Sequence, residues 1–188
     1  MNTELKKRII TSIGLLSLLT TMYFYSFIMI GALLIMAIII WIEFYALISK
    51  IIRGNKFQDI FFRFIFKSTS LLYLSTFVGF IFVIESHYID LKIYLLYSVL
   101  VAILSDIGGL VFGKTFKGKK LTKISPNKTI SGSIGSIVLS IVLIPIFYNE
   151  LIIYDLFTLI IITIVISLIS QIGDLFISFL KRKAKVKD

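Results

Sequence analysis

Two aspartates within long apolar stretches have the residue type and the surroundings of a cation site. Asp106 stands in SDIGG and Asp174 stands in QIGD, so each has a glycine nearby that lets another backbone or a ligand approach. A charge at membrane depth costs about 2.5–3.5 kcal/mol, so it needs a function or a partner. Carboxylate oxygens suit Mg²⁺, which takes one or two carboxylates together with substrate phosphates. We therefore expect a cavity that holds Mg²⁺ at Asp106 and Asp174.

Other metal chemistry is disfavoured by the composition. The chain has no cysteine, and its one histidine, His87, falls between two apolar stretches. A transition-metal site would need imidazole or thiolate ligands. A third acidic residue inside an apolar stretch, Glu43 in WIEFY, lies among aromatic residues typical of the membrane interface. We expect Glu43 to pair with loop lysines and orient its helix end.

A basic segment at residues 113–136 reads GKTFKGKKLTKISPNKTISGSIGS. A simple membrane anchor consists of lysine clusters, whereas this segment interleaves lysine with glycine, serine, threonine and Pro126. Ser125, Thr129 and backbone N–H groups offer hydrogen bonds, and Lys128 offers a positive charge. This mixture favours phosphate binding over a surface anchor, as at glycine-rich turns and helix N-termini. The spacing of a Walker P-loop is absent.

The elements that position these residues follow from hydropathy. Of the 188 residues 58% are hydrophobic, and the mean hydropathy is +1.01, which excludes an ordinary soluble domain. A helix needs roughly 20 apolar residues to cross a bilayer. Six apolar segments predict an all-α, polytopic membrane helix bundle in one domain, residues 1–188. The segments are residues 9–22, 27–49, 68–84, 91–112, 133–148 and 151–178, with a turn near Tyr25 and Ser26.

The basic residues predict the orientation of this bundle. The net charge is +10, and all lysines and arginines except Lys92 lie at the two termini or in the second and fourth connections. Cytoplasmic connections are enriched in lysine and arginine, so both termini and the basic loop at residues 113–132 are expected in the cytoplasm. Glu43, Asp106 and Asp174 then lie at one depth beneath these loops. This distribution indicates a membrane protein and no nucleic-acid partner.

Two blocks of the sequence resemble the phosphatidate cytidylyltransferases, or CDP-diacylglycerol synthases. The first, SDIGG followed by SPNKT within residues 105–136, looks like the family's S-D and S-P-x-K-T runs. The second, SFLKRKAKVKD, is similar to the start of the signature S-x-[aliphatic]-K-R-x₄-K-D and follows the family's G-D at Gly173 and Asp174. The resemblance extends from the N-terminal hairpin, including Trp41, to Asp188. The family's later P-x-H-G-G and D-R-x-D segments have no counterpart in these residues.

The resemblance implies a magnesium-dependent transfer of CMP from CTP to phosphatidate, giving CDP-diacylglycerol and pyrophosphate at the cytoplasmic face of the inner membrane. Asp174 is then the first metal ligand, and Asp106 is a second ligand or an organiser of the metal site. The implied catalytic groups are Asp106, Asp174, Lys128, Lys181 and Arg182. The implied substrate-binding residues are Ser125, Pro126, Thr129, Ser178, Lys187 and Asp188.

Some positions depart from the family pattern and leave alternatives open. Gly109 and Leu110 stand where the family often has Ala-Tyr, and Ile130, Ser131 and Gly132 stand where it commonly has Trp-Glu-Gly. The alternatives are another CTP-dependent lipid enzyme, or a truncated non-catalytic relative or subunit. A second copy of the chain, in a homodimer, is a further partner to test beside the substrates and membrane lipids.

Overall fold

The computed structural model describes residues 3–122, 125, 128–151 and 155–186, and these residues fold almost entirely into helices. They divide into two compact units, unit 1 at residues 1–92 and unit 2 at residues 93–188. The all-helical prediction is confirmed for the described part of the chain. The helices are α1 (Thr3–Phe24), α2 (Ser26–Ile51), α3 (Phe57–His87), the short 3₁₀ helix η1 (Ile89–Leu91), α4 (Lys92–Phe116), α5 (Ile130–Ile141), α6 (Ile144–Phe147) and α7 (Leu156–Lys183).

Five stretches are long and apolar enough to cross a membrane: α2, α3, α4, α5 together with α6, and α7. The apolar part of α1, Ile10–Phe24, is shorter. Large apolar side chains cover the outside of these helices, as lipid contact requires. The chain is therefore an integral membrane protein.

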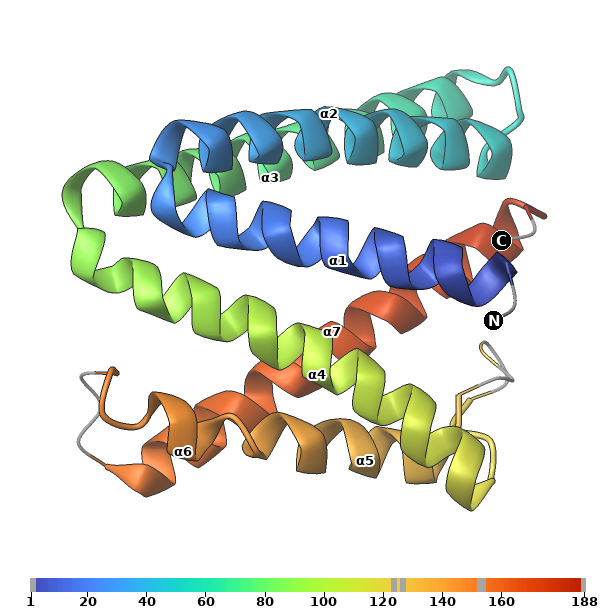
Figure 1. The fold of residues 1–188 in the computed structure, drawn as a ribbon. Helices are drawn as coiled ribbons and strands as arrows, with labels where there is room; N and C mark the ends of the chain where they lie inside the picture. The colour runs from blue at the N-terminus through green and yellow to red at the C-terminus, as the bar shows by residue number, and fades with distance from the viewer. Residues whose placement is uncertain (1–2, 123–124, 126–127, 152–154, 187–188) are drawn as a thin grey trace. The chain divides into compact units, whose positions relative to one another are not determined.

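Unit 1 is formed by α1, α2 and α3. The predicted turn between the first two helices is confirmed, because Tyr25 alone interrupts the helical stretch. Helix α2 packs along α3 on one side and along α1 on another (Figure 1). Near the end of α3, Lys92 Nζ donates to Glu85 Oε1 at 2.5 Å, and both side chains are buried. The one lysine outside the basic connections therefore has a carboxylate partner.

In unit 2, α4, α5 and α7 pack against one another (Figure 1). The core at one end of these helices consists of Tyr97, Val101, Leu143, Ile144, Phe147, Leu151 and Leu159. Helices α4 and α5 approach closely through glycine. A Cβ atom added at Gly132 would lie 2.7 Å from the Gly109 carbonyl oxygen, and one added at Gly108 would overlap the Gly135 carbonyl. Small residues permit such contact between membrane helices.

Several helices differ from the boundaries that hydropathy predicted, and two of these differences have a clear physical reason. Helix α3 begins at Phe57 rather than near residue 68, because its first turns carry Asp59, Arg63 and Lys67, which lower hydropathy without preventing a helix. The fifth segment is divided into α5 and α6 by a tightened turn in which Leu143 N–H donates to the Ser140 carbonyl. Pro145 follows this turn, and it lacks the N–H group that would continue the regular α-helical pattern.

Candidate functional site

A cavity of about 330 Å³ opens among α4, α5, α7 and the segment before α5. Its volume falls near the lower end of small-molecule sites, which span roughly 300–1,000 Å³. All of its residues belong to unit 2, and its polar groups come from three helices and one loop. The lining residues are Ser105, Asp106, Gly109 and Leu110 of α4, Leu121, Ser125, Lys128 and Thr129 of the loop, Gly132, Ser133 and Ser136 of α5, and Gln171 and Asp174 of α7.

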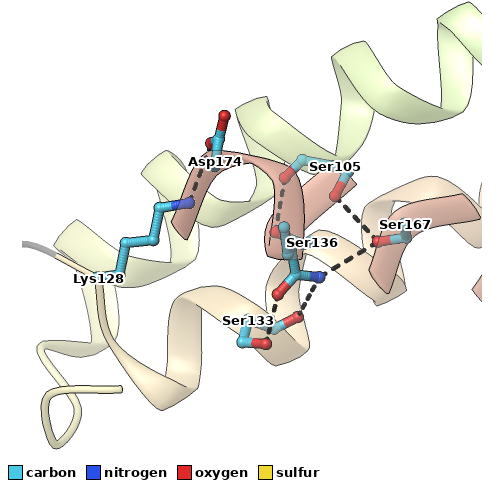
Figure 2. A network of polar contacts seen from close by, with 7 residues as sticks. Ser105, Lys128, Ser133, Ser136, Ser167 and Asp174 are labelled. Carbon is cyan, nitrogen blue, oxygen red and sulfur yellow. Dashed lines mark hydrogen bonds and ion pairs between the residues drawn. The ribbon is translucent and has the colours of Figure 1, made fainter. Parts of the chain in front are cut away.

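Two carboxylates and one ammonium group gather at this cavity. Lys128 Nζ donates to Asp174 Oδ2 at 3.0 Å (Figure 2). Asp106 also lines the cavity and lies within electrostatic range of both Lys128 and Asp174. The ion pair is open to solvent, with 54% of the Asp174 side chain and 29% of the Lys128 side chain exposed. Exposed pairs contribute about 0–1 kcal/mol, so a ligand can separate these two groups at little cost.

The loop before α5 fixes the backbone of Lys128. Lys120 and Thr129 form an antiparallel bridge, in which Ile130 N–H donates to the Lys119 carbonyl at 2.9 Å. Beside it, Leu121 N–H donates to the Lys128 carbonyl at 2.8 Å. These bonds hold the backbone of Lys128 beside the cavity, while its flexible side chain can still move.

The N-terminus of α5 faces the same cavity. Thr129 is the N-cap residue, and its Oγ1 accepts a hydrogen bond from Gly132 N–H at 3.1 Å. Thr129, Gly132 and Ser133 all line the cavity, so the positive end of the helix dipole lies beside it. A helix N-terminus next to a lysine suits a phosphate group. The Thr129 hydroxyl caps α5. Thr129 therefore has a structural role besides the substrate-binding role predicted for it.

A network of hydroxyl and amide groups connects the helices beside the cavity (Figure 2). Ser105 Oγ and Ser167 Oγ are 2.9 Å apart, and Ser136 Oγ donates to the Ser105 carbonyl at 2.6 Å. Ser133 Oγ donates to Gln171 Oε1 at 2.5 Å, and Gln171 Nε2 donates to Ser167 Oγ at 3.3 Å. These bonds connect α4, α5 and α7, so the network fixes the helices that carry Asp106 and Asp174.

The structure brings some of the predicted site residues together and leaves others outside the cavity. Asp106, Lys128, Asp174, Ser125 and Thr129 line it. None of the remaining predicted residues on α7 lines it, namely Ser178, Lys181 and Arg182. Ser178 and Lys181 follow Asp174 by four and seven residues, which places them on the same side of α7. Pro126, Lys187 and Asp188 lie outside the described residues.

Sequence reasoning missed four polar residues of the cavity: Ser105, Ser133, Ser136 and Gln171. Two of them carry a signal in their spacing. Gln171 precedes Asp174 by three residues and Ser133 follows Thr129 by four, so helical periodicity places each near a residue already singled out. This spacing is a weak signal, because neutral side chains do not stand out among charged ones.

The donor set of the cavity matches a hard cation. Asp106 and Asp174 supply carboxylate oxygens, and Ser125 and Ser133 supply hydroxyl groups. Within the described ranges, no three His, Cys, Asp or Glu side chains lie close enough together to hold a metal ion by themselves. Two carboxylates suffice for Mg²⁺ when substrate phosphates and water complete its coordination.

Comparison with known proteins finds several relatives that share one name. The chain is 33% identical to the phosphatidate cytidylyltransferase of Staphylococcus saprophyticus over 153 residues, which cover 80% of this chain and 56% of that protein. It is 34% identical to the enzyme of that name from Staphylococcus epidermidis over 153 residues, with the same coverage. It is 41% identical to that from Staphylococcus haemolyticus over 98 residues, which cover 50% of this chain and 37% of that protein.

The chain thus spans about half the length of the curated relatives it matches. No solved structure matches it significantly. The profile of the Cytidylyltransferase family matches residues 1–188. From the first residue to the last, this chain belongs to the cytidylyltransferase family.

Proposed function

We propose that this chain carries the site of a phosphatidate cytidylyltransferase, which transfers CMP from CTP to phosphatidate at the cytoplasmic face of the membrane. The observation that carries the proposal is the cavity in which Lys128 and Asp174 form an ion pair close to Asp106. Family membership supports the reaction class, and the names of the similar staphylococcal proteins support the lipid substrate. The basic loop beside the cavity favours polyphosphate binding from the aqueous side.

In this reaction an oxygen of the phosphatidate phosphate attacks the α-phosphorus of CTP. The new P–O bond forms as the bond between the α-phosphorus and the bridging oxygen to the β-phosphate breaks, so pyrophosphate leaves. Phosphoryl transfer depends mainly on positioning and on neutralising negative charge. Lys128 and the N-terminus of α5 are placed to bind phosphate oxygens. Arrival of the triphosphate would draw Lys128 away from Asp174 and free that carboxylate.

Asp106 and Asp174 are the residues that would hold Mg²⁺, because they are the two carboxylates of the cavity. When bound there, Mg²⁺ supplies Lewis-acid neutralisation of the phosphate charge. Lys181 and Arg182, on α7 beyond Asp174, would meet the lipid phosphate or the triphosphate as it enters. Ser133 and Gln171 orient the walls of the cavity through their shared hydrogen bond.

The test uses the 188-residue chain in membranes and measures two quantities. One is the binding of labelled CTP in the presence of Mg²⁺, and the other is phosphatidate-dependent transfer of the label into extractable lipid. Asp174→Asn is expected to abolish transfer, and Lys128→Gln is expected to weaken CTP binding. Asp155→Asn is the matched control, since this exposed residue of unit 2 lies outside the cavity.

Transfer that persists in Asp174→Asn would overturn the proposed role of Asp174. Failure of the unaltered chain both to bind CTP and to transfer the label would overturn the proposal for this chain. CTP binding that requires Lys128 but yields no transfer would support the phosphate site and contradict catalytic competence of these 188 residues.

A further inference from the structure

Unit 1 contains a second hollowed surface, and it lies between α2 and α3. Two hollows of about 570 Å³ and 610 Å³ share the lining residues Trp41 and Leu71 and therefore adjoin. Together they are here named the α2–α3 groove. The α3 residues that line it recur every three or four positions from Ile60 to Phe82, which is one stripe of a helix. None of its residues lines the cavity of unit 2.

The two ends of the groove differ in chemistry. From Leu71 to Phe82 its walls are apolar apart from Ser75 and the indole N–H of Trp41. Phe82 follows Leu71 by 11 positions on α3, which is about 16 Å at the rise of an α-helix. One leaflet of a bilayer has a hydrocarbon layer of roughly 15 Å, half of the whole core. The apolar part therefore has the length and character of a site for one acyl chain.

The other end of the groove is cationic and aromatic. It contains Arg63 and Lys67, one helical turn apart on α3. Arg63 Nη1 donates to the Ile52 carbonyl at 3.4 Å, and Lys67 Nζ lies 3.3 Å from the centre of the Tyr45 ring. In the described part of the chain, neither cation has a carboxylate within ion-pair distance. The guanidinium has five N–H donors, so most of its hydrogen-bonding capacity is available to a ligand.

We propose that the α2–α3 groove binds one anionic glycerophospholipid. Its phosphate lies at Arg63 and Lys67, and one acyl chain lies along the apolar part beside Leu71, Val78 and Phe82. Charge complementarity decides for this occupant over a transmembrane helix of another protein, because a helix would place an apolar face against two unpaired cations. The site rests on unit 1 alone and does not depend on the reaction proposed for unit 2.

Cations near the cytoplasmic end of a helix commonly orient the chain in the membrane. Whether a cation lines the groove distinguishes that role from ligand binding. Arg53 and Lys56 lie in the connection just before α3, are exposed, and do not line the groove. Arg63 and Lys67 are half-buried beside Trp41. A residue pair inside the groove and a pair of the same two residue types outside it therefore allow a matched comparison.

Trp41 is the only tryptophan of the chain, and it lies where the cationic and apolar parts meet. Bromine on a lipid acyl chain quenches tryptophan fluorescence at contact. The chain is reconstituted in vesicles that contain either brominated phosphatidylglycerol or brominated phosphatidylcholine at equal mole fraction. We expect stronger quenching of Trp41 by the anionic lipid, and addition of salt should reduce the difference only in part.

The double variant Arg63→Gln/Lys67→Gln should lose this preference, by about fivefold in relative affinity for each cation removed. The control Arg53→Gln/Lys56→Gln removes two charges of the same types from the connection just before α3 and should keep most of the preference. The variant Gly79→Leu tests the apolar part of the groove. A Cβ atom added at Gly79 meets no atom within 4 Å, so the leucine would enter the groove without disturbing the helices.

Gly31→Leu is the matched control for that variant, because Gly31 also has open space but does not line the groove. Gly79→Leu should reduce quenching by the anionic lipid to the level of the neutral lipid, while Gly31→Leu should not. Equal quenching by the two lipids, an equal loss in both double variants, or no quenching by either lipid would each overturn the proposal. The last result would mean that another helix or a second copy fills the groove.

Discussion

Gln171 connects two helices of the cavity through both ends of its amide group. Its Oε1 accepts from Ser133 Oγ, and its Nε2 donates to Ser167 Oγ and, at 3.5 Å, to the Ser133 carbonyl. The residue itself carries no charge and stands one helical turn before Asp174. We infer that Gln171 sets the distance between the N-terminus of α5 and Asp174 and takes no part in the chemical step.

Replacing Gln171 by leucine should lower the stability of unit 2 by roughly 1–2 kcal/mol, since each interhelical hydrogen bond in a membrane protein contributes about 0.6 kcal/mol. A double-mutant cycle with Ser133→Ala, followed by thermal unfolding in detergent, measures the interaction energy between Gln171 and Ser133. We expect a coupling energy of at least about 0.5 kcal/mol. Strictly additive effects would show that the two residues do not act together.

The charged residues of the cavity and the polar residues of its loop could be predicted from sequence, and the buried serines inside the helices could not. Asp106 and Asp174 are conspicuous because a carboxylate in an apolar helix is costly, and Lys128 stands among turn-forming residues. Ser105, Ser136 and Ser167 look like ordinary small residues of a membrane helix. Only the packing of α4, α5 and α7 shows that their hydroxyl groups bond to one another.

Helix packing in unit 2 depends on glycines where α4 meets α5. At Gly135 an added Cβ atom would overlap the side chain of Phe112, whereas at Gly173 it would meet no atom within 4 Å. Gly135→Ala should therefore destabilise unit 2 by about 1–3 kcal/mol, the usual cost of overpacking. Gly173→Ala should be neutral, or stabilising by up to about 1 kcal/mol, because alanine favours a helix. Thermal unfolding of both variants tests this, and equal effects would contradict the close approach.

The start of α7 should make unit 2 sensitive to acid. Asp155 caps this helix, and hydrogen bonds from the hydroxyl and the backbone N–H of Thr158 hold the pKa of its carboxyl below the usual value. A lowered pKa in the folded state means that the carboxylate stabilises the fold above its unfolded pKa of about 3.9. That contribution is lost as the pH falls through the folded-state pKa.

Asp155→Asn keeps a capping side chain but cannot titrate. Unfolding curves recorded from pH 6 down to pH 3 should therefore show a smaller loss of stability in this variant than in the unaltered chain. Parallel pH profiles for the two proteins would rule out Asp155 as a source of acid sensitivity.

At the level of helices, hydropathy located the apolar stretches but not their ends. It placed the turn at Tyr25, since a polar break there separates two apolar runs. It missed the first turns of α3, where Arg63 and Lys67 belong to the helix although they lower its hydropathy. Those same residues form the cationic end of the α2–α3 groove. Hydropathy therefore indicated neither the start of α3 nor this part of the groove.

For the whole molecule, the distribution of lysine and arginine predicts which connections face the cytoplasm. The loop between α4 and α5 holds five lysines, whereas the connection between α6 and α7 holds Glu150 and Asp155 and no lysine or arginine. The positive-inside rule places the first of these in the cytoplasm and the second outside. The proposed reaction depends on this orientation, because Lys128 lies in the basic loop and the cell's CTP is in the cytosol.

The chain contains no cysteine, so single cysteines can report the side of each connection without prior substitutions. Lys119→Cys should react in intact cells only with a membrane-permeant maleimide, and Asn149→Cys should react also with an impermeant one. Ile38→Cys, within α2, is the control for a position in the membrane and should react poorly with both. If Lys119→Cys reacted with the impermeant reagent and Asn149→Cys did not, the whole orientation would be reversed. The proposed cavity would then open away from the cytosolic supply of CTP, and the cytidylyltransferase reaction could not proceed there.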